Sequence, residues 1–196
     1  MFELNADYWN KQYQNNQTGW DIGYVSTPLK EYFDQLKDKT IKILIPGSGN
    51  SYEAEYLWKN GFTNVKVLDI SDLALNSFQN RLPDFPESNL LNENFFSHKS
   101  EYDLIVEQTF FSALHPEQRK DYAAKTSELL KPSGKLIGLL FGSAFRFDGP
   151  PFGGSREEYI QLFSPFFHIL KLEMAYNSIK PRNGNELFFI MKKLIS

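Results

Sequence analysis

Cysteine is absent from this sequence of 196 residues. Its absence excludes disulfide bonds, thiolate metal sites and a cysteine nucleophile. Histidine is scarce as well: His98, His115 and His168 are far apart and lack the spacing of metal ligands. We therefore expect no bound metal.

Long hydrophobic runs are also missing, and the N-terminal stretch MFELNADYWNKQYQ lacks the basic and apolar regions of a secretory signal. The chain carries no strong charge of either sign, since its net charge is −3 and its isoelectric point is near 5.7. No cluster of Lys and Arg stands out, which argues against broad binding to nucleic acid or acidic membranes. We expect a cytoplasmic protein that binds neither nucleic acid nor membrane.

What the sequence does contain is typical of a folded domain: 41% of the residues are hydrophobic and 23% are charged. A chain of this length can bury one substantial core. No repeat or linker divides it. We expect a single domain over residues 1–196, in which an arm (residues 1–40) precedes a core (residues 41–196).

Helical and extended patterns alternate along the core, which predicts an α/β fold with a parallel sheet covered on both faces. The final two extended runs are separated by only about 11 residues, too few for a helical crossover, so they should pair antiparallel. The expected helices cover residues 28–36, 51–59, 71–81, 116–130 and 156–163. The expected strands cover residues 41–46, 64–70, 90–95, 102–108, 135–141, 166–175 and 187–194.

Two glycines stand at the end of the first predicted strand, in the stretch ILIPGSGNSYEAEYL. Gly47 and Gly49 allow positive φ and the close approach of a ligand to the backbone. The third glycine of a dinucleotide loop is missing, because Tyr52 occupies the sixth position. Asp69, 22 residues after Gly47, ends the next strand and can bind ribose hydroxyls. This combination suits a nucleoside without phosphates, such as S-adenosylmethionine; alternatively, the glycines form only a tight turn and Asp69 caps a helix.

Five segments together resemble a known family: IPGSGNSYEAEYL, VLDIS, YDLIVEQTFFSALHPEQRKDY, LLKPSGKLIGLLF and GPPFGG. In order and spacing, over nearly the whole chain, they are similar to the thiopurine S-methyltransferase superfamily, most of all to its bacterial and plant thiol and halide methyltransferases. The resemblance implies a Rossmann-like, seven-stranded methyltransferase sheet with helices on both faces and the last strand antiparallel. It also implies an S-adenosylmethionine-dependent methyltransferase of the EC 2.1.1 type that acts on a small thiol or related soft anion.

The resemblance further implies a set of cofactor contacts. Three positions depart from the common pattern of the family: Tyr13 stands where Trp is frequent, Asn94 where an acid is frequent, and Ser51 in place of a third loop glycine. The implied cofactor residues are Trp9, Tyr13, Trp20, Gly47, Gly49, Asp69, Ile70, Asn94, Phe95 and Gln108.

Physical chemistry gives a separate reason to expect aromatic residues beside this cofactor. A sulfonium is a permanent cation, and an aromatic face attracts a cation by roughly 0.5–2 kcal/mol, depending on desolvation. The alternative for Trp9 and Trp20 is that they only pin a loose arm to the core.

For the methyl acceptor, the resemblance implies contacts with Arg119, Arg182 and Phe111. A guanidinium there would favour a thiolate or hold another anion. Without the resemblance, Arg119 would be interpreted as one half of a surface ion pair with Glu117 or Asp121.

Glu107, at the end of its predicted strand, is the carboxylate best placed to act as a base, and supporting the amino group of the cofactor is its alternative role. The loop over residues 147–155 (FDGPPFGGS) either covers the acceptor or is a long connection.

Two other classes of function stay open at this point. One is a protein that binds S-adenosylmethionine without turnover. The other is a nicotinamide-dependent oxidoreductase, which is disfavoured by Tyr52 and by the lack of a substrate domain. We expect a monomer whose partner is a small-molecule methyl acceptor.

Overall fold

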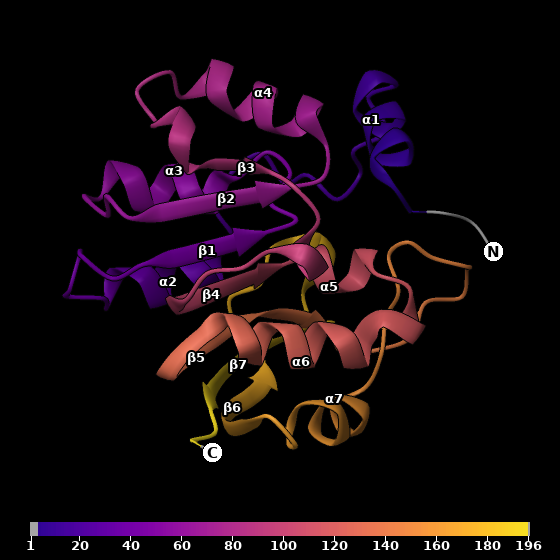
Figure 1. Ribbon diagram of the computed structural model, residues 1–196. Helices are drawn as coiled ribbons and strands as arrows, with labels where there is room; N and C mark the ends of the chain where they lie inside the picture. The colour runs from indigo at the N-terminus through magenta and orange to yellow at the C-terminus, as the bar shows by residue number, and fades with distance from the viewer. Residues whose placement is uncertain (1–3, 196) are drawn as a thin grey trace. The chain divides into compact units, whose positions relative to one another are not determined.

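The computed structural model describes residues 4–195, and the chain forms two compact units that divide between His98 and Lys99. Each unit has its own strands and helices (Figure 1). The first unit contains α1 (Ala6–Gln14), α2 (Thr27–Asp34), β1 (Ile43–Pro46), α3 (Tyr52–Lys59), β2 (Val65–Asp69), α4 (Asp72–Arg81), the short 3-10 helix η1 (Glu87–Asn89), β3 (Leu90–Asn92) and η2 (Phe95–Ser97).

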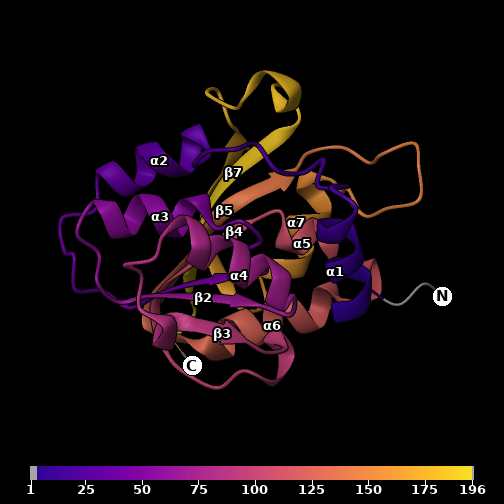
Figure 2. The same cartoon turned by 90° about the horizontal axis from the view of Figure 1, so that it is seen from above.

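The three strands of the first unit are parallel and lie in the order β3-β2-β1. Their register places Ile43 beside Val65 and Val67 beside Leu90. All four residues of β1 are buried, as expected for a continuous apolar strand. Helices α3 and α4 pack on β2, and α2 lies alongside α3 (Figures 1 and 2). The predicted alternation of helix and strand is confirmed here.

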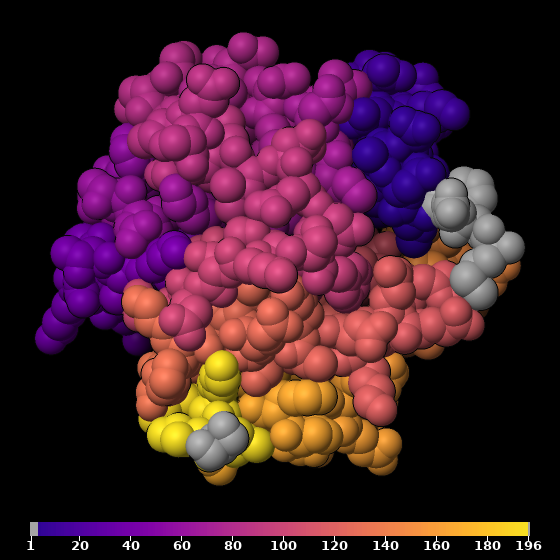
Figure 3. Space-filling view, viewed as in Figure 1, coloured from indigo at the N-terminus to yellow at the C-terminus, as the bar shows by residue number. Residues whose placement is uncertain are grey.

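The helix α1 was not predicted, because its sequence is polar and none of its residues is fully buried. Asn5 caps its first turn by accepting a hydrogen bond from the Tyr8 N–H over 3.0 Å. The helix packs on α4 (Figure 3), where Asn10 contacts both Asp72 at 2.8 Å and Ser71 at 2.6 Å. Polar contacts with α4 therefore hold one side of this helix.

The second unit has strands in the order β4-β5-β7-β6. Strands β4 and β5 are parallel, and β7 is antiparallel to both β5 and β6, which confirms the predicted antiparallel pairing. The unit contains β4 (Tyr102–Gln108), α5 (Phe110–Ala113), η3 (Pro116–Gln118), α6 (Arg119–Leu129), β5 (Leu130–Phe141), α7 (Arg156–Phe163), β6 (Phe167–Met174), η4 (Lys180–Arg182) and β7 (Glu186–Lys193).

Strand β5 begins earlier than predicted. The strand contains an irregularity over Pro132–Gly134: Tyr102 pairs with Leu130, but Leu104 pairs with Lys135. Ser133 takes φ +66° there, a conformation typical of bulges and turns. The helix α6 accordingly ends at Leu129.

An aromatic core joins the helices of the second unit to each other. The ring of Phe111 meets the rings of Tyr122 and Tyr159 edge-on at 5.3 and 5.7 Å, and it lies 5.8 Å from Phe163. Aromatic pairs of this geometry add about 0.5–1.5 kcal/mol beyond the area that they bury. They fix α5, α6 and α7 relative to one another. Figure 2 shows the long loop between β5 and α7 extending from this unit. In residues 4–195, none of the helices combines the length and apolar character needed to cross a membrane.

Candidate cofactor site and acceptor pocket

The glycine loop between β1 and α3 has three residues in the left-handed region. Gly47, Gly49 and Ser51 take φ values of +54°, +52° and +53°. A glycine adopts such a conformation at no steric cost, whereas a serine is strained by it. Ser51, where the family resemblance leads us to expect a third glycine, is thus in a true left-handed conformation.

Asp69 closes this loop from the end of β2. Its Oδ2 accepts a hydrogen bond from the Gly49 N–H over 2.8 Å, and its Oδ1 accepts one from the Ser71 N–H over 2.8 Å. The residue is only 7% exposed, and this burial raises the pKa of the carboxyl despite the backbone donors. A carboxylate held at the strand end beside a glycine loop can accept further hydrogen bonds from ribose hydroxyls.

The predicted aromatic residues of the arm form one cluster over the glycine loop. The ring of Trp20 lies edge-on to Trp9 at 5.5 Å and to Tyr13 at 5.9 Å. A Cβ atom added to Gly49 would lie 2.8 Å from the Tyr13 hydroxyl, so the arm touches the loop at the point where only glycine fits. Burial, together with the nearby Asp69 charge, raises the pKa of Tyr13.

The remaining residues predicted for the adenine side follow β2 and β3. Ile70 is half-buried and Phe95 is buried, whereas Asn94 is exposed and uses its side chain to cap η2, accepting from the Phe96 N–H at 2.8 Å. Asn92, which was not singled out, binds the carbonyls of Asp69 and Ile70 at 3.1 and 3.2 Å. It was missed because an asparagine at a strand end has no signature in a single sequence.

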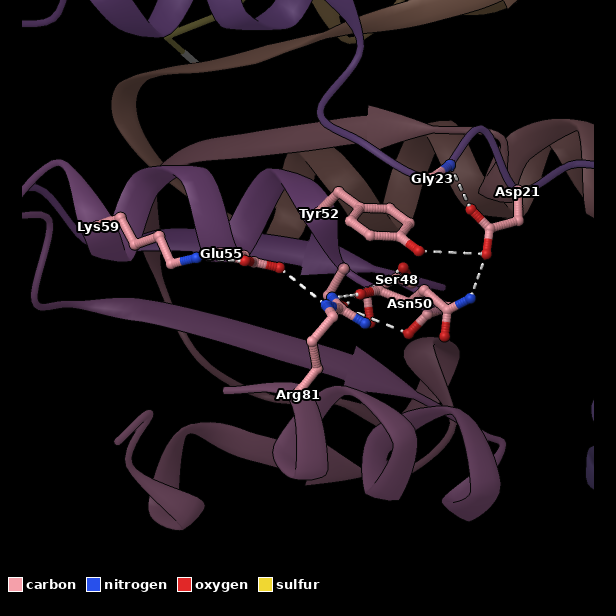
Figure 4. Close-up of polar contacts among 10 residues, drawn as sticks. Asp21, Gly23, Ser48, Asn50, Tyr52, Glu55, Lys59 and Arg81 are labelled. Atoms are coloured by element: carbon pink, nitrogen blue, oxygen red, sulfur yellow. Dashed lines mark hydrogen bonds and ion pairs between the residues drawn. The ribbon is translucent and has the colours of Figure 1, made fainter. Parts of the chain in front are cut away.

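A polar network also braces the loop from two sides (Figure 4). The Asn50 side chain donates to Asp21 of the arm, and the Asn50 carbonyl accepts from Arg81 of α4. Arg81 in turn binds Glu55 at 2.8 Å and lies over the Tyr52 ring at 4.4 Å. Asp21, Asn50 and Arg81 were not predicted, because their partners are about 30 residues apart in the sequence.

One polar atom in the loop is left over. The buried hydroxyl of Ser48 finds no hydrogen-bond partner among the described residues. Buried polar groups are normally paired, so an unpaired hydroxyl beside two glycines fits a loop that binds a polar ligand. The residues present therefore suit a nucleoside cofactor.

In the second unit, Glu107 is fully buried at the end of β4. Its Oε1 accepts from the Phe111 N–H at 2.8 Å, and its Oε2 accepts from the Tyr122 hydroxyl at 2.6 Å. Burial raises the pKa of this carboxyl to about 7. Both oxygens are thus used inside the protein, where they cap α5 and bind α6. The predicted role as a base stays a prediction that this geometry does not favour.

A small pocket lies beside Glu107, at the carboxyl ends of the parallel strands β4 and β5, where ligands bind in folds of this kind. The predicted residues Gln108 and Phe111 both line it. The buried Oε1 of Gln108 has no hydrogen-bond partner in the described part of the chain. The lining is otherwise mainly apolar and aromatic: Thr109, Ser112, Leu139, Leu140, Phe141, Phe152, Tyr159 and Glu186 complete it.

Arg119 is 5% exposed, and so it is not part of a surface ion pair. Its partner is Glu158, and it also donates to the carbonyls of Phe152 and Gly153 at 3.3 and 2.8 Å. Its guanidinium lies over the Phe111 ring at 4.8 Å. The alternative pairing with Glu117 or Asp121 is wrong: the arginine holds the loop that brings Phe152 to the pocket.

Arg182 is paired as well. Its Nη1 lies 3.1 Å from Oε1 of Glu186, a buried carboxylate that lines the pocket and also accepts from the Ser178 hydroxyl at 2.8 Å. The guanidinium lies 5.8 Å from the centre of the Phe141 ring. Residues 4–195 contain no group of three or more His, Cys, Asp or Glu side chains arranged to hold a metal ion.

Comparison with solved structures shows the fold. The chain is similar to the 1,6-didemethyltoxoflavin-N1-methyltransferase of Burkholderia thailandensis, solved with S-adenosylhomocysteine (TM-score 0.76, 16% identity, covering 97% of this chain and 87% of that one). It is also similar to the magnesium protoporphyrin IX methyltransferase of Synechocystis, solved with S-adenosylmethionine (TM-score 0.76, 12% identity, 99% of both chains). The predicted seven-stranded methyltransferase fold is confirmed: β3-β2-β1 and β4-β5-β7-β6 are its strands.

The family follows from the sequence itself. Residues 4–193 match the profile of the thiopurine S-methyltransferase (TPMT) family, and the chain belongs to this family. It is an S-adenosylmethionine-dependent methyltransferase, and the nicotinamide alternative is set aside. Its relatives include a probable thiol methyltransferase 2 of Arabidopsis thaliana (29% identical, covering 98% of this chain and 88% of the relative). The thiocyanate methyltransferase 1 of Brassica oleracea is 28% identical (95% and 84%), and a thiopurine S-methyltransferase of Vibrio cholerae is 28% identical (80% and 80%).

Proposed function

We propose that this methyltransferase transfers the methyl group of S-adenosylmethionine to a small thiol or a related soft anion. The names of its relatives support this acceptor class, since they include thiol, thiocyanate and thiopurine methyltransferases. The observation that carries the proposal is the aromatic lining at the ends of β4 and β5, where Phe111, Phe141 and Phe152 surround a pocket of about 10 Å³. The buried amide oxygen of Gln108 is a hydrogen-bond acceptor, so it suits the ammonium of the cofactor's methionine part rather than an anionic acceptor.

When bound, S-adenosylmethionine supplies an electrophilic methyl group on a sulfonium. Gly47 and Gly49 let the loop backbone take the left-handed conformation at the mouth of β1, Asp69 binds the ribose hydroxyls, and Ile70 and Phe95 contact the adenine. Asn94 supplies a polar group there, Gln108 binds the methionine part, and the cluster of Trp9, Tyr13 and Trp20 faces the cation and shields it from water.

Methyl transfer to a thiolate needs little proton chemistry, and correct alignment alone can supply about 7–11 kcal/mol. In this proposal Phe111 and Phe152 form the wall against which the acceptor lies. Arg119 fixes the loop of Phe152 through its hydrogen bonds to the carbonyls of Phe152 and Gly153. Arg182 acts on the acceptor pocket through its ion pair with Glu186, which lines the pocket. Glu107 acts by holding α5 in place.

A panel of acceptors tests this proposal. The protein is incubated with methyl-labelled S-adenosylmethionine and aromatic thiols, aliphatic thiols, thiocyanate, iodide, or aromatic amines and phenols of matched shape. We expect labelled thioethers, or labelled products from the soft anions, and none from the amines and phenols. Cofactor binding without transfer to any thiol or soft anion would favour the non-catalytic alternative.

We also propose that residues 1–196 act as one cytoplasmic methyltransferase domain and as a monomer. The solved methyltransferase that matches the chain over 99% of both lengths supports the single domain. Analytical ultracentrifugation should give the mass of one chain, 22.8 kDa, and a stable dimer would contradict the monomer.

A further inference from the structure

Asn50 joins three elements of the first unit. Its side-chain amide donates to the carboxylate of Asp21 in the arm, while its backbone carbonyl accepts from the guanidinium of Arg81 in α4 (Figure 4). Asn50 itself belongs to the glycine loop and follows Gly49, whose N–H binds Asp69. A single residue of the glycine loop thus contacts both the arm and a core helix.

On the arm side, Asp21 is fixed in one orientation. Its Oδ1 accepts from the Gly23 N–H at 2.7 Å, and its Oδ2 faces Asn50 and the Tyr52 hydroxyl, the latter at 3.5 Å. The preceding residue is Trp20, the centre of the aromatic cluster over Gly49. Holding Asp21 therefore holds the aromatic cluster against the loop.

On the core side, Arg81 is held by two groups of α3. Its Nε lies 2.8 Å from Oε2 of Glu55, which also binds Lys59 at 2.5 Å, and its guanidinium stacks on the Tyr52 ring at 4.4 Å. The planar fork of arginine can bind a carboxylate and a carbonyl at the same time. Arg81 thereby fixes the peptide of Asn50 relative to α3 and α4.

We propose that Asp21, Asn50 and Arg81, here termed the Asn50 relay, are positioning residues that couple closure of the arm to cofactor binding at the glycine loop. The loop has two glycines and a strained serine, so its own backbone preferences do not define one conformation. The hydrogen bonds of the relay hold the loop in one conformation and connect that conformation to the position of the arm. This inference rests on the proposed role of the arm over the cofactor.

Thermodynamic linkage makes the proposal quantitative. If cofactor binding favours the closed arm, then a closed arm must favour cofactor binding by the same factor. Substitutions in the relay should therefore weaken cofactor binding, although Asp69, Gly47 and Gly49 are not substituted.

The test is calorimetric titration with S-adenosylhomocysteine of wild type, Asp21→Asn, Asn50→Ala, Arg81→Met, Arg81→Lys and the double variant Asp21→Asn/Asn50→Ala. Asp38→Asn, an exposed aspartate of the same unit, is the matched charge control. Hydrogen exchange of residues 15–26, with and without the ligand, is measured on the same proteins.

We expect Asp21→Asn and Asn50→Ala each to raise Kd about tenfold or more, a change equivalent to about 1.4 kcal/mol. The double variant should be no weaker than the weaker single variant, because both remove the same link. Arg81→Lys should retain part of the affinity that Arg81→Met loses. Ligand should slow exchange of residues 15–26 in wild type and in Asp38→Asn, but much less in the relay variants.

Relay variants that bind as tightly as Asp38→Asn would overturn the relay. So would additive losses with normal ligand protection of the arm, since these indicate independent structural damage. Failure of wild type to bind S-adenosylhomocysteine would overturn the proposed function and the relay together, whereas normal wild-type binding with unaffected variants overturns the relay alone.

Discussion

The N–H of Gly49 donates to Oδ2 of Asp69 over 2.8 Å, so the second glycine of the loop and the acid at the end of β2 are directly joined. A Cβ atom on the same glycine would lie only 2.8 Å from the Tyr13 hydroxyl. The core acid, the loop and the arm therefore meet at one residue.

Gly49→Ala should lose both stability and cofactor affinity. A Cβ atom there lies 2.8 Å from the Tyr13 hydroxyl at φ +52°, and the left-handed conformation alone costs about 1–2 kcal/mol. Gly61→Ala is the matched control, since it has φ +86° with nothing within 4 Å. It should lower the melting temperature but leave S-adenosylhomocysteine binding intact. Adding Tyr13→Phe to Gly49→Ala should restore part of the affinity, and equal affinities for the two alanine variants would contradict this account.

Ser51→Gly should raise the melting temperature. Ser51 has φ +53°, and relief of about 1–2 kcal/mol of strain exceeds the extra entropy that glycine loses on folding, about 0.5–1 kcal/mol. Ser155→Gly is the control, for which we expect a change in melting temperature of the opposite sign. Ser155 has φ −130° and caps α7 through the Glu158 N–H, so its replacement should destabilise. A lower melting temperature for both variants would argue against strain at Ser51.

Glu107 predicts a pH dependence of stability. Its pKa rises from 4.5 to about 7 in the folded protein because the carboxyl is buried. The protonated form is therefore favoured by folding. The contribution of Glu107 to the free energy of unfolding is fully present below pH 4.5 and is lost as the pH rises to about 7. This contribution is at most about 3 kcal/mol.

Chemical denaturation of wild type and Glu107→Gln between pH 4.5 and 8 measures this effect. Wild type should lose more stability with rising pH than the glutamine variant. Asp69, whose pKa is raised in the same direction, is present in both proteins and cancels in the difference. Parallel curves for the two proteins would contradict the raised pKa of Glu107.

Arg119→Met should release the loop that carries Phe152, because the arginine binds Glu158 and two loop carbonyls. We expect faster hydrogen exchange over residues 147–155 and a lower kcat/KM for the acceptor, with S-adenosylhomocysteine affinity nearly unchanged. Arg146→Met, in an exposed part of the same connection, controls for the lost charge. Unchanged exchange and activity would remove Arg119 from the acceptor side.

The sequence predicted the strands and most helices because their apolar periods agree with the local burial. It did not predict α1, which lacks a fully buried residue and contacts α4 through the polar side chain of Asn10. It predicted that Asp69 ends a strand beside the loop. It could not predict the Glu158 partner of Arg119, which lies 39 residues away, since nothing in a local charge pattern specifies such a pair.

The measurement that tests the account most directly is calorimetric titration of wild type and Asp69→Asn with S-adenosylhomocysteine. Asparagine keeps the size of the side chain but removes the charge that we assign to the ribose hydroxyls. The account predicts that Asp69→Asn, verified as folded by circular dichroism, weakens binding by about 1.5–3 kcal/mol, or about 10- to 150-fold. An unchanged affinity in the folded variant would contradict it.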